Sequence, residues 1–524
     1  MVALPAWAPL RRRAFRALWT AQFVANVGTW AQTVGAQWLM GDLGGGELAV
    51  ALVQTATTLP VFLLVVPSGA LGDIVDRRRL LLTGQAFMGV GAGALAILTA
   101  VHLMTPWLLL LLIGVMAVGQ AVSVPSYQAI QPELVPRDEI PLAAMLNGAN
   151  MNLARAAGPA LGGALIAAVG PAATFAFNAV SFFGVLLVLY RWDRPPDRRP
   201  LGSEHILSAT RAGLRYIRNA PRFATVLARS ALFMVFASGL WALLPAVARD
   251  QLGLSAGGYG LLLAGVGLGA VIGTVVVPGL RDRIGTGAMV NLAMAVFGGT
   301  MMAVGLSGST IVVVGVLLVA GIAWIGVQST LSATAQMLLP AWTRARALAY
   351  MQFVFMGGQA LGALGWGAVA EGSLTAAFVI PAAGLLVATL ISVRALPLPE
   401  ARFDVTAVRH WPEPAGAMSV DSEAGPVLVM VEWPVEPAHA ETFGRLMRQR
   451  MRRSRRRTGA TLWGLFQDTG DRCLFVETFT VATWHEHWRQ HVERGTVGDR
   501  DLETEARGML LPGAKPHVRH LIWV

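Results

Sequence analysis

Apolar stretches long enough to cross a lipid bilayer follow one another through the first 395 residues of the chain. A helix needs about 20 residues to span about 30 Å of hydrocarbon, and twelve stretches meet that length, at 15–40, 48–72, 80–101, 106–126, 142–168, 172–190, 223–248, 257–279, 287–306, 309–331, 344–369 and 374–394. Hydrophobic residues make up 55% of the chain and charged residues only 14%, an excess that a soluble protein of this size does not bury. The sequence predicts an all-α, multi-pass membrane protein with twelve transmembrane helices.

The arginines between these stretches predict the orientation in the membrane. Very short connections alternate with longer loops that carry arginine, such as Arg77–Arg79, and the opposite side has only Arg249. Because short cytoplasmic loops accumulate positive charge, both termini are expected in the cytoplasm. The net charge of +11 arises largely from these dispersed loops, so we expect no nucleic-acid partner.

Two repeats of six helices are predicted on either side of a central polar segment. Residues 191–222 contain Pro195, Pro196, Pro200 and several arginines, and they are predicted to form a linker between bundles at 1–190 and 223–395. The sequence Gly158–Gly163 recurs in similar form at Gly358–Ala363. Parallel six-helix repeats are typical of transporters, with the substrate site near the midplane between the two halves.

The composition becomes polar after residue 395, which indicates a different kind of domain. We expect a linker at 396–425 and a small cytoplasmic α+β domain at 426–524, with strands at 427–433, 462–467, 474–479 and 517–524 and helices at 437–453, 485–492 and 499–508. His487 and His491 lie one helical turn apart, but two imidazoles without a third ligand do not make a metal site. We therefore predict no metal site and no cofactor.

The loop after the second apolar stretch carries the most specific motif. Gly69, Gly72 and Asp73 precede a cluster of arginines that includes Arg77 and Arg78. A carboxylate at a helix end can pair with such arginines, and the pair can break and reform when the helices move. In this loop the chain resembles the major facilitator superfamily, although Ile74 stands where many members carry a basic residue. The resemblance implies a gating loop formed by these five motif residues.

The fifth stretch carries a second motif, composed of Gly158, Pro159, Gly162 and Gly163. Small residues let helix backbones approach closely, and proline bends a helix; generic helix packing is the alternative reading. This motif resembles the one in exporters of the superfamily, and residues 1 to about 395 resemble its enterobactin-exporter-like branch. The resemblance implies a bacterial inner-membrane protein that exports a siderophore, drug or secondary metabolite by proton antiport through alternating access.

Polar and aromatic residues within the apolar stretches predict a substrate cavity. Arg155 is interpreted as the one charge deep in the membrane; its planar donors suit a carboxylate or catecholate, or it bonds structurally to neighbours such as Asn150. No acidic residue lies at mid-depth, so no proton-carrying residue is identified. Interhelical packing is the alternative for each member of the predicted cavity, which comprises Asn26, Trp30, Gln37, Gln120, Asn150, Arg155, Trp241, Trp324, Gln328, Gln352 and Gln359.

The remaining features limit the functional class. The chain has no glycine-rich ATP-binding loop ending in lysine, which favours a secondary carrier that is not an enzyme and whose partners are a small-molecule substrate, membrane lipid and H+. The C-terminal domain resembles the ferredoxin-like domains related to antibiotic-biosynthesis monooxygenases, which implies a homodimer through this domain. Two alternatives stay open: a transporter–enzyme fusion whose C-terminal domain modifies or binds the exported metabolite, and a receptor or scaffold.

Overall fold

The computed structural model describes residues 7–74, 76–130, 134–136, 139–192, 214–398, 406, 408, 421 and 424–523. The chain divides by its internal contacts into two compact units, which we describe separately. The first consists of Met1–Ser203, Leu227–Ser332 and Ala349–Glu400, and the second of Glu204–Val226, Ala333–Leu348 and Ala401–Val524.

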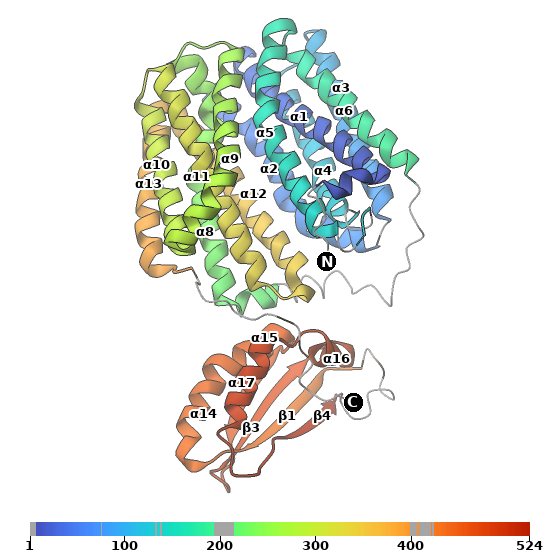
Figure 1. Ribbon diagram of the computed structural model, residues 1–524, viewed down its shortest axis with the longest axis vertical. Helices are drawn as coiled ribbons and strands as arrows, with labels where there is room; N and C mark the ends of the chain where they lie inside the picture. The colour runs from blue at the N-terminus through green and yellow to red at the C-terminus, as the bar shows by residue number, and fades with distance from the viewer. Residues whose placement is uncertain are drawn as a thin grey trace. The chain divides into compact units, whose positions relative to one another are not determined.

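Twelve long helices occupy the positions predicted from the apolar stretches, within the part of the chain that is described. The first six, drawn blue to teal in Figure 1, gather beside the last six, drawn green to orange. In chain order they are α1 (Arg13–Asp42), α2 (Glu47–Ile74), α3 (Arg77–Ala100), α4 (Pro106–Ile130), α5 (Ile140–Val169), α6 (Pro171–Arg191), α8 (Pro221–Ala246), α9 (Ala256–Ile284), α10 (Thr286–Leu306), α11 (Thr310–Leu338), α12 (Ala341–Gly372) and α13 (Leu374–Ala395).

Helix α1 differs from the other eleven in composition. Among the described residues, eleven helices are both long and apolar enough to cross a membrane, and α1 is not among them. Its sequence carries many polar side chains, including Gln22, Asn26, Gln32 and Gln37. These polar groups are accommodated because α1 packs against α2, α5, α6 and α9. Through its contact with α9, this polar helix also reaches the second half of the bundle.

Glycine seams join the first and fifth helix of each repeat in the same way. In the first half, a Cβ at Gly158 would lie 2.4 Å from the Cβ of Trp30, and one at Gly162 would lie 2.8 Å from the Cα of Ala31. In the second half, a Cβ at Gly362 would lie 2.3 Å from the carbonyl oxygen of Val235 in α8. Only glycine permits backbones to approach this closely. The recurring sequence thus corresponds to an equivalent helix contact in each half.

The C-terminal part forms the α+β structure expected from the sequence. Strands β1 (Val427–Pro434), β2 (Leu462–Gln467), β3 (Leu474–Val481) and β4 (His517–Ile522) make an antiparallel sheet in the order β2-β3-β1-β4. The chain order of strands and helices is that of a ferredoxin-like fold, which confirms the predicted class. The connecting helices are α14 (Ala440–Leu446), α15 (Arg452–Thr458), α16 (Trp484–Val492) and α17 (Val497–Arg507).

The two faces of this sheet differ in what covers them. On β1, Val427, Val429, Val431 and Trp433 are buried and belong to one hydrophobic core, as alternation along a half-covered strand requires. The opposite face carries exposed apolar side chains, namely Leu462, Phe466 and Leu521 at 67%, 60% and 41% exposure. An apolar sheet face of this kind usually marks an interaction surface.

Segments from the helical region belong to the same unit as this domain. The guanidinium of Arg494 lies 5.0 Å from the ring centre of Trp342, and Arg215 approaches Glu486 at 3.7 Å. Burial acts to raise the pKa of Glu486, but the hydrogen bond and charge of Arg494 and the charge of Arg215 outweigh it and hold that pKa below its ordinary value. Helix α16 is therefore linked by charge to the segment that precedes α8.

Candidate functional site

Three tryptophans predicted to line a cavity meet in the first unit. The ring of Trp241 in α8 lies 6.2 Å from that of Trp30 in α1 and 5.1 Å from that of Trp324 in α11, measured between ring centres. Phe355 of α12 lies 6.1 Å from Trp324. We call Trp30, Trp241 and Trp324 the tryptophan cluster. It joins one helix of the first half to two of the second, as the predicted site requires.

Arg155 of α5 belongs to the same region. Its guanidinium lies 5.5 Å from the ring centre of Trp30, a distance at which a cation is attracted to the ring face. Its Nε and the indole nitrogens of Trp241 and Trp324 are buried and, among the described residues, have no hydrogen-bond acceptor. Buried donors without partners are costly, and this region combines such donors with aromatic surfaces.

The predicted asparagines make a separate connection between α1 and α5. The side chain of Asn26 donates to that of Asn150 at 2.9 Å, and Asn150 donates to the carbonyl oxygen of Trp19 at 2.9 Å. Asn150 is fully enclosed. The structural alternative for Arg155 was a bond to a neighbour such as Asn150. The described hydrogen bonds of Asn150 go to α1 instead.

Gln37 marks the end of the bundle where the two halves are held together. Its side chain donates to the carbonyl oxygen of Trp241 at 3.2 Å and accepts a hydrogen bond from the Tyr259 hydroxyl. Arg249, in the π-helical turn η4 (Val247–Gln251), donates to Asp42 at 2.7 Å and to the carbonyl oxygen of Trp38 at 3.1 Å. We call this region, where α1 and α8 end, the closed end.

Glycine makes room for these contacts at the closed end. A Cβ at Gly41 would collide with the Arg249 guanidinium, so the arginine can lie across the end of α1 only because this residue has no side chain. A cavity of about 290 Å³ adjoins the pair, lined by residues that include Glu47 and Asp250. The closed end therefore combines an ion pair with a small polar cavity.

Helices α5 and α9 form the tightest seam between the halves. A Cβ at Gly260 would lie 2.8 Å from the carbonyl oxygen of Pro159 and 2.9 Å from the Cα of Gly163. Further along, a Cβ at Gly267 would lie 2.5 Å from the Cα of Ala156. The helix-5 motif thus has two faces: Gly158 and Gly162 contact α1, and Gly163 contacts α9.

Helices α2 and α12 meet across the halves mainly through side chains. The rings of Phe62 and Phe353 stack with their centres 4.1 Å apart, and the Thr55 hydroxyl donates to the carbonyl oxygen of Ala360 at 3.3 Å. Two glycines of α12 also contribute: a Cβ at Gly357 would lie 2.5 Å from the Phe62 ring, and one at Gly367 would lie 2.5 Å from the Cβ of Ala51. These glycines face mainly side chains of α2, whereas those of the α5–α9 seam face the backbone of the partner helix.

The predicted gating loop is described only in part. The side chains of Gly69, Gly72, Asp73 and Arg77 lie outside the described residues, so their predicted roles stay predictions. Arg78 donates to the carbonyl oxygens of Leu189 at 2.9 Å and Tyr190 at 2.6 Å, which places its charge at the C-terminal end of α6, where cations are favoured. Asp76, which the motif did not single out, caps α3 by accepting from the Arg79 amide at 2.9 Å.

Four predicted cavity glutamines have no described hydrogen bond to the tryptophan cluster. Gln120 of α4, Gln328 of α11, and Gln352 and Gln359 of α12 are half-buried. Within the described part of the chain, no hydrogen bond joins them to Trp30, Trp241 or Trp324. Their role as cavity residues stays a prediction.

A second arginine lies within an apolar stretch, where the sequence interpretation singled out Arg155 alone, and it is more enclosed than the half-buried Arg155. Arg229 of α8 is 1% exposed and donates to the carbonyl oxygens of Leu396 and Ser392 at 2.7 and 2.8 Å and to Asn291 at 2.7 Å. Its place inside the seventh apolar stretch is visible in the sequence.

Tyr259 was not selected from the sequence for another reason: its hydrogen-bond partner Gln37 lies 222 residues away.

A third histidine joins the two that the sequence had placed on one helical turn. His487 and His491 of α16 and His520 of β4 each offer a nitrogen, and these atoms lie within 4.8 Å of one another. Burial, and then the charges of His491 and His520, lower the pKa of His487 to about 3, and burial lowers the pKa of His520. No third candidate ligand was evident in the sequence, because His520 follows His491 by 29 residues and reaches the pair only through the sheet. The prediction of no metal site stays a prediction.

Comparisons with known proteins agree with this geometry. A family model described as a transmembrane secretion effector, of the MFS type, matches residues 4–524. The enterobactin exporter EntS of Escherichia coli (strain UTI89 / UPEC) is 28% identical over 323 residues, which are 61% of this chain and 75% of the exporter. The enterobactin exporter EntS of Shigella boydii serotype 18 shows the same identity and coverage.

Solved transporter structures share the fold of the helical part. The nucleoside transporter NupG superposes with a TM-score of 0.56 at 14% identity, over 73% of this chain and 99% of that one. A bacterial homologue of the iron transporter ferroportin, in an inward-facing state, gives a TM-score of 0.57 at 18% identity, over 73% and 98% of the two chains. At these identities the likeness concerns the fold.

Proposed function

The chain belongs to the transmembrane secretion effectors and is a transporter of the major facilitator superfamily, and on this premise we propose that it exports an acidic, aromatic small molecule of the siderophore type. The route runs from the cytoplasm across a bacterial inner membrane, by alternating access coupled to proton entry. Two of the relatives are enterobactin exporters at 28% identity, which supports the substrate class.

The buried donors around the tryptophan cluster carry this proposal. The Nε of Arg155 and the indole nitrogens of Trp241 and Trp324 lack an acceptor within the described part of the chain. A catecholate or carboxylate supplies several acceptor oxygens, and a flat aromatic body stacks on indole rings. A sugar lacks the aromatic faces, and a simple inorganic anion does not need them.

The closed end supports an alternating-access cycle. With both termini in the cytoplasm, as the arginine distribution predicts, the end where α1 and α8 finish faces the periplasm. The Arg249–Asp42 ion pair and the Gln37–Tyr259 hydrogen bond then act as a latch on the periplasmic side. Release of substrate requires these contacts to break while the halves rock apart.

Carboxylates near this latch are the groups that we assign to proton coupling. Asp42 is paired with Arg249, and Glu47 and Asp250 line the adjoining cavity. A proton that neutralises Asp42 removes the ionic partner of Arg249 and favours opening. This assignment replaces an acidic residue at mid-depth, which the sequence does not offer.

Transport into liposomes with an imposed pH gradient tests the function. We expect gradient-driven movement of a catecholate siderophore that an uncoupler abolishes. Trp324→Phe keeps an aromatic ring but removes the indole donor, so it should slow catecholate transport; the matched control Trp107→Phe changes an exposed residue of α4 and should have no effect. The proposal is contradicted if folded protein transports the catecholate at a rate that neither the pH gradient nor Trp324→Phe changes.

A variant at Arg155 tests whether this arginine recognises the substrate or only supports the structure. Arg155→Gln should reduce transport of catecholates and carboxylates far more than that of neutral amphipathic compounds. An equal loss for both classes would assign Arg155 to structure instead.

Asp73→Asn should abolish transport of all substrates while membrane insertion is retained, because the gating loop serves the cycle rather than recognition.

The C-terminal domain is assigned to homodimer formation. Leu462, Phe466 and Leu521 form an apolar sheet face, and two such sheets from separate copies can stack at about 10 Å. Phe466→Glu should convert dimers to monomers, as measured by light scattering of the protein in detergent. Dimers that persist in this variant would refute the sheet interface.

A further inference from the structure

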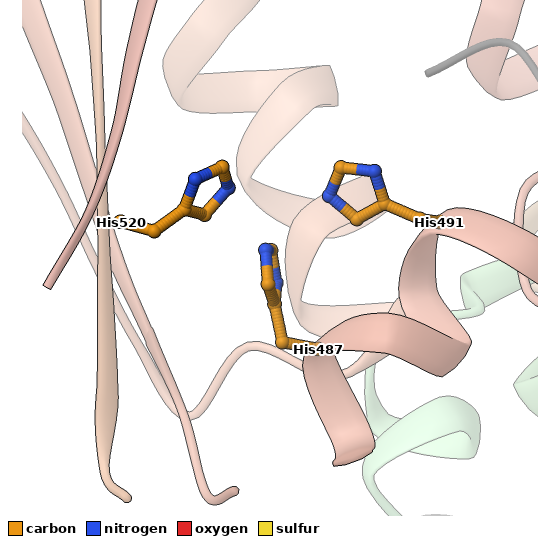
Figure 2. Close-up of side chains that lie close together, drawn as sticks. All are labelled: His487, His491 and His520. Carbon is orange, nitrogen blue, oxygen red and sulfur yellow. The ribbon is translucent and has the colours of Figure 1, made fainter. Parts of the chain in front are cut away.

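The α+β domain holds three imidazoles around one point, and this arrangement differs from ordinary packing of histidine in a core. His487 and His491 extend from successive turns of α16, and His520 extends from β4 (Figure 2). Figure 2 shows the three rings turned toward one another. The ring of His487 lies 4.7 Å from that of His491 and 4.8 Å from that of His520, between ring centres.

The fold brings these residues together from two sequence segments. Residues i and i+4 lie on one face of a helix, which places His487 and His491 side by side. The register of the sheet pairs His520 with Val429, and Val429 belongs to the core on the helix-covered face. His520 therefore lies on the same side of the sheet as α16, on the edge strand of the sheet.

We propose that His487, His491 and His520 bind a divalent transition-metal ion of the zinc type, with a fourth position open to water or another small oxygen ligand. Three histidine nitrogens with one open position are an established zinc coordination set, and imidazole suits this class of ion. The ligating atoms lie within 4.8 Å of one another. Tetrahedral coordination at Zn–N distances of about 2.0–2.1 Å brings ligand nitrogens to about 3.4 Å, which small side-chain rotations supply.

The state of the ring nitrogens supports this assignment. His487 is fully buried, and its Nε2 has no partner among the described residues; the Nε2 of His520 is likewise buried without one. Each unsatisfied buried polar group costs about 1–3 kcal/mol. A purely structural cluster would bear that cost twice, whereas a bound ion uses these atoms as ligands.

Neighbouring side chains fix the orientation of the His487 ring. Nδ1 of His487 lies 3.2 Å from Oε1 of Gln490, and donation from Nδ1–H leaves Nε2 with the lone pair that a metal needs. The side-chain nitrogen of Gln490 in turn donates to the Thr458 hydroxyl at 3.0 Å. The ring of Trp484 packs against both His487 and His520, with centres 5.7 and 6.0 Å away. His520 is half-buried, which leaves a path from solvent.

Metal binding by the full-length protein in detergent tests this site. The protein is purified through a tag without histidine, stripped with a chelator, and titrated with Zn2+ against a chromophoric chelator. We expect one ion per chain, bound by three nitrogens at about 2.0–2.1 Å as measured by X-ray absorption. Folded protein that retains no zinc after dialysis, or that binds it through oxygen alone, overturns the proposal.

A pair of isosteric variants distinguishes ligation from packing. His520→Gln should weaken zinc binding by more than about 100-fold, which exceeds the usual effect of an outer-sphere change. His520→Glu has the same size but keeps a ligating oxygen, so it should retain most of the affinity. His485→Gln, on the same helix but outside the cluster, should bind zinc like the parent chain. Equal behaviour of the Gln and Glu variants would show that His520 serves packing.

Local stability of α16 gives a second readout that does not depend on transport. Zinc should slow amide exchange in α16 and β4, because a ligand that binds only the folded state stabilises it. The effect should vanish in His520→Gln. Exchange that is unchanged by zinc in the parent chain would contradict binding at these three residues.

Discussion

The two contacts α5–α9 and α2–α12 both cross between the halves of the transporter, yet they are built from different residues. Along α5–α9, Gly163, Gly260 and Gly267 bring the helix backbones together. Along α2–α12, Phe62 stacks on Phe353 and Thr55 reaches a carbonyl oxygen. Backbone contacts tolerate no added atom, whereas side chains can change rotamer or separate. From this difference we expect α5–α9 to act as the axis about which the halves rock and α2–α12 to act as a gate.

The largest expected effect comes from adding one methyl group to the glycine seam. Gly260→Ala places a Cβ 2.8 Å from the carbonyl oxygen of Pro159, so α5 and α9 must separate, at a cost of about 1–3 kcal/mol. We expect a lower melting temperature and loss of transport.

Gly265→Ala is the matched control on the same helix. Its added Cβ meets no atom closer than 3.6 Å, and alanine favours a helix over glycine by about 1 kcal/mol. The melting temperature should therefore stay the same or rise. Equal destabilisation by both substitutions would show that the seam has no special role.

At the α2–α12 contact we expect a smaller effect, which changes the balance between conformations rather than the stability. An aromatic pair contributes about 0.5–1.5 kcal/mol beyond its burial, so Phe62→Leu together with Phe353→Leu should shift the closed-to-open ratio by up to about tenfold. Spin labels at Val101→Cys and Leu306→Cys, both at exposed helix ends, report the separation of the halves. Cys473 is the only cysteine and is first replaced by serine. An unchanged distance distribution would mean that α2–α12 is not the gate.

The ion pair at the closed end should contribute least. Arg249 and Asp42 are partly exposed, and such pairs contribute about 0.2–1 kcal/mol. A double-mutant cycle with Arg249→Gln and Asp42→Asn should give a coupling energy in this range, measured on the same spin-label distances. High salt should reduce it, and a coupling that salt leaves unchanged would contradict an ionic latch.

Local patterns predicted most of the fold, and long-range contacts account for what they missed. The apolar stretches located all twelve helices, including α1, whose polar residues fail a hydropathy criterion but whose length and neighbours indicate a span. The helix-5 motif predicted close packing, yet its second partner, Gly260, required the tertiary structure. His520 is the clearest case: its approach to His487 follows from strand register, which no local pattern reports.

The sequence indicated which residues to select for the candidate site, but not how they are arranged in space. Trp30, Trp241, Trp324 and Arg155 could be selected because aromatic and charged residues are unusual inside apolar stretches. That rule does not predict which partner a polar residue finds, as with the Asn26–Asn150 bond. It also fails when a charge is overlooked, as with Arg229.

The contacts of Arg229 have a consequence for the order in which the chain is made. Two of its three described acceptors, Ser392 and Leu396, are synthesised 163 and 167 residues later, while Asn291 follows after 62. During most of the synthesis of the second half, this arginine therefore has only part of its final set of acceptors, and a buried charge that lacks partners is costly. Entry of α13 completes the set. The last helix thus acts as a closing step for the second half, because only its arrival supplies the acceptors at Ser392 and Leu396.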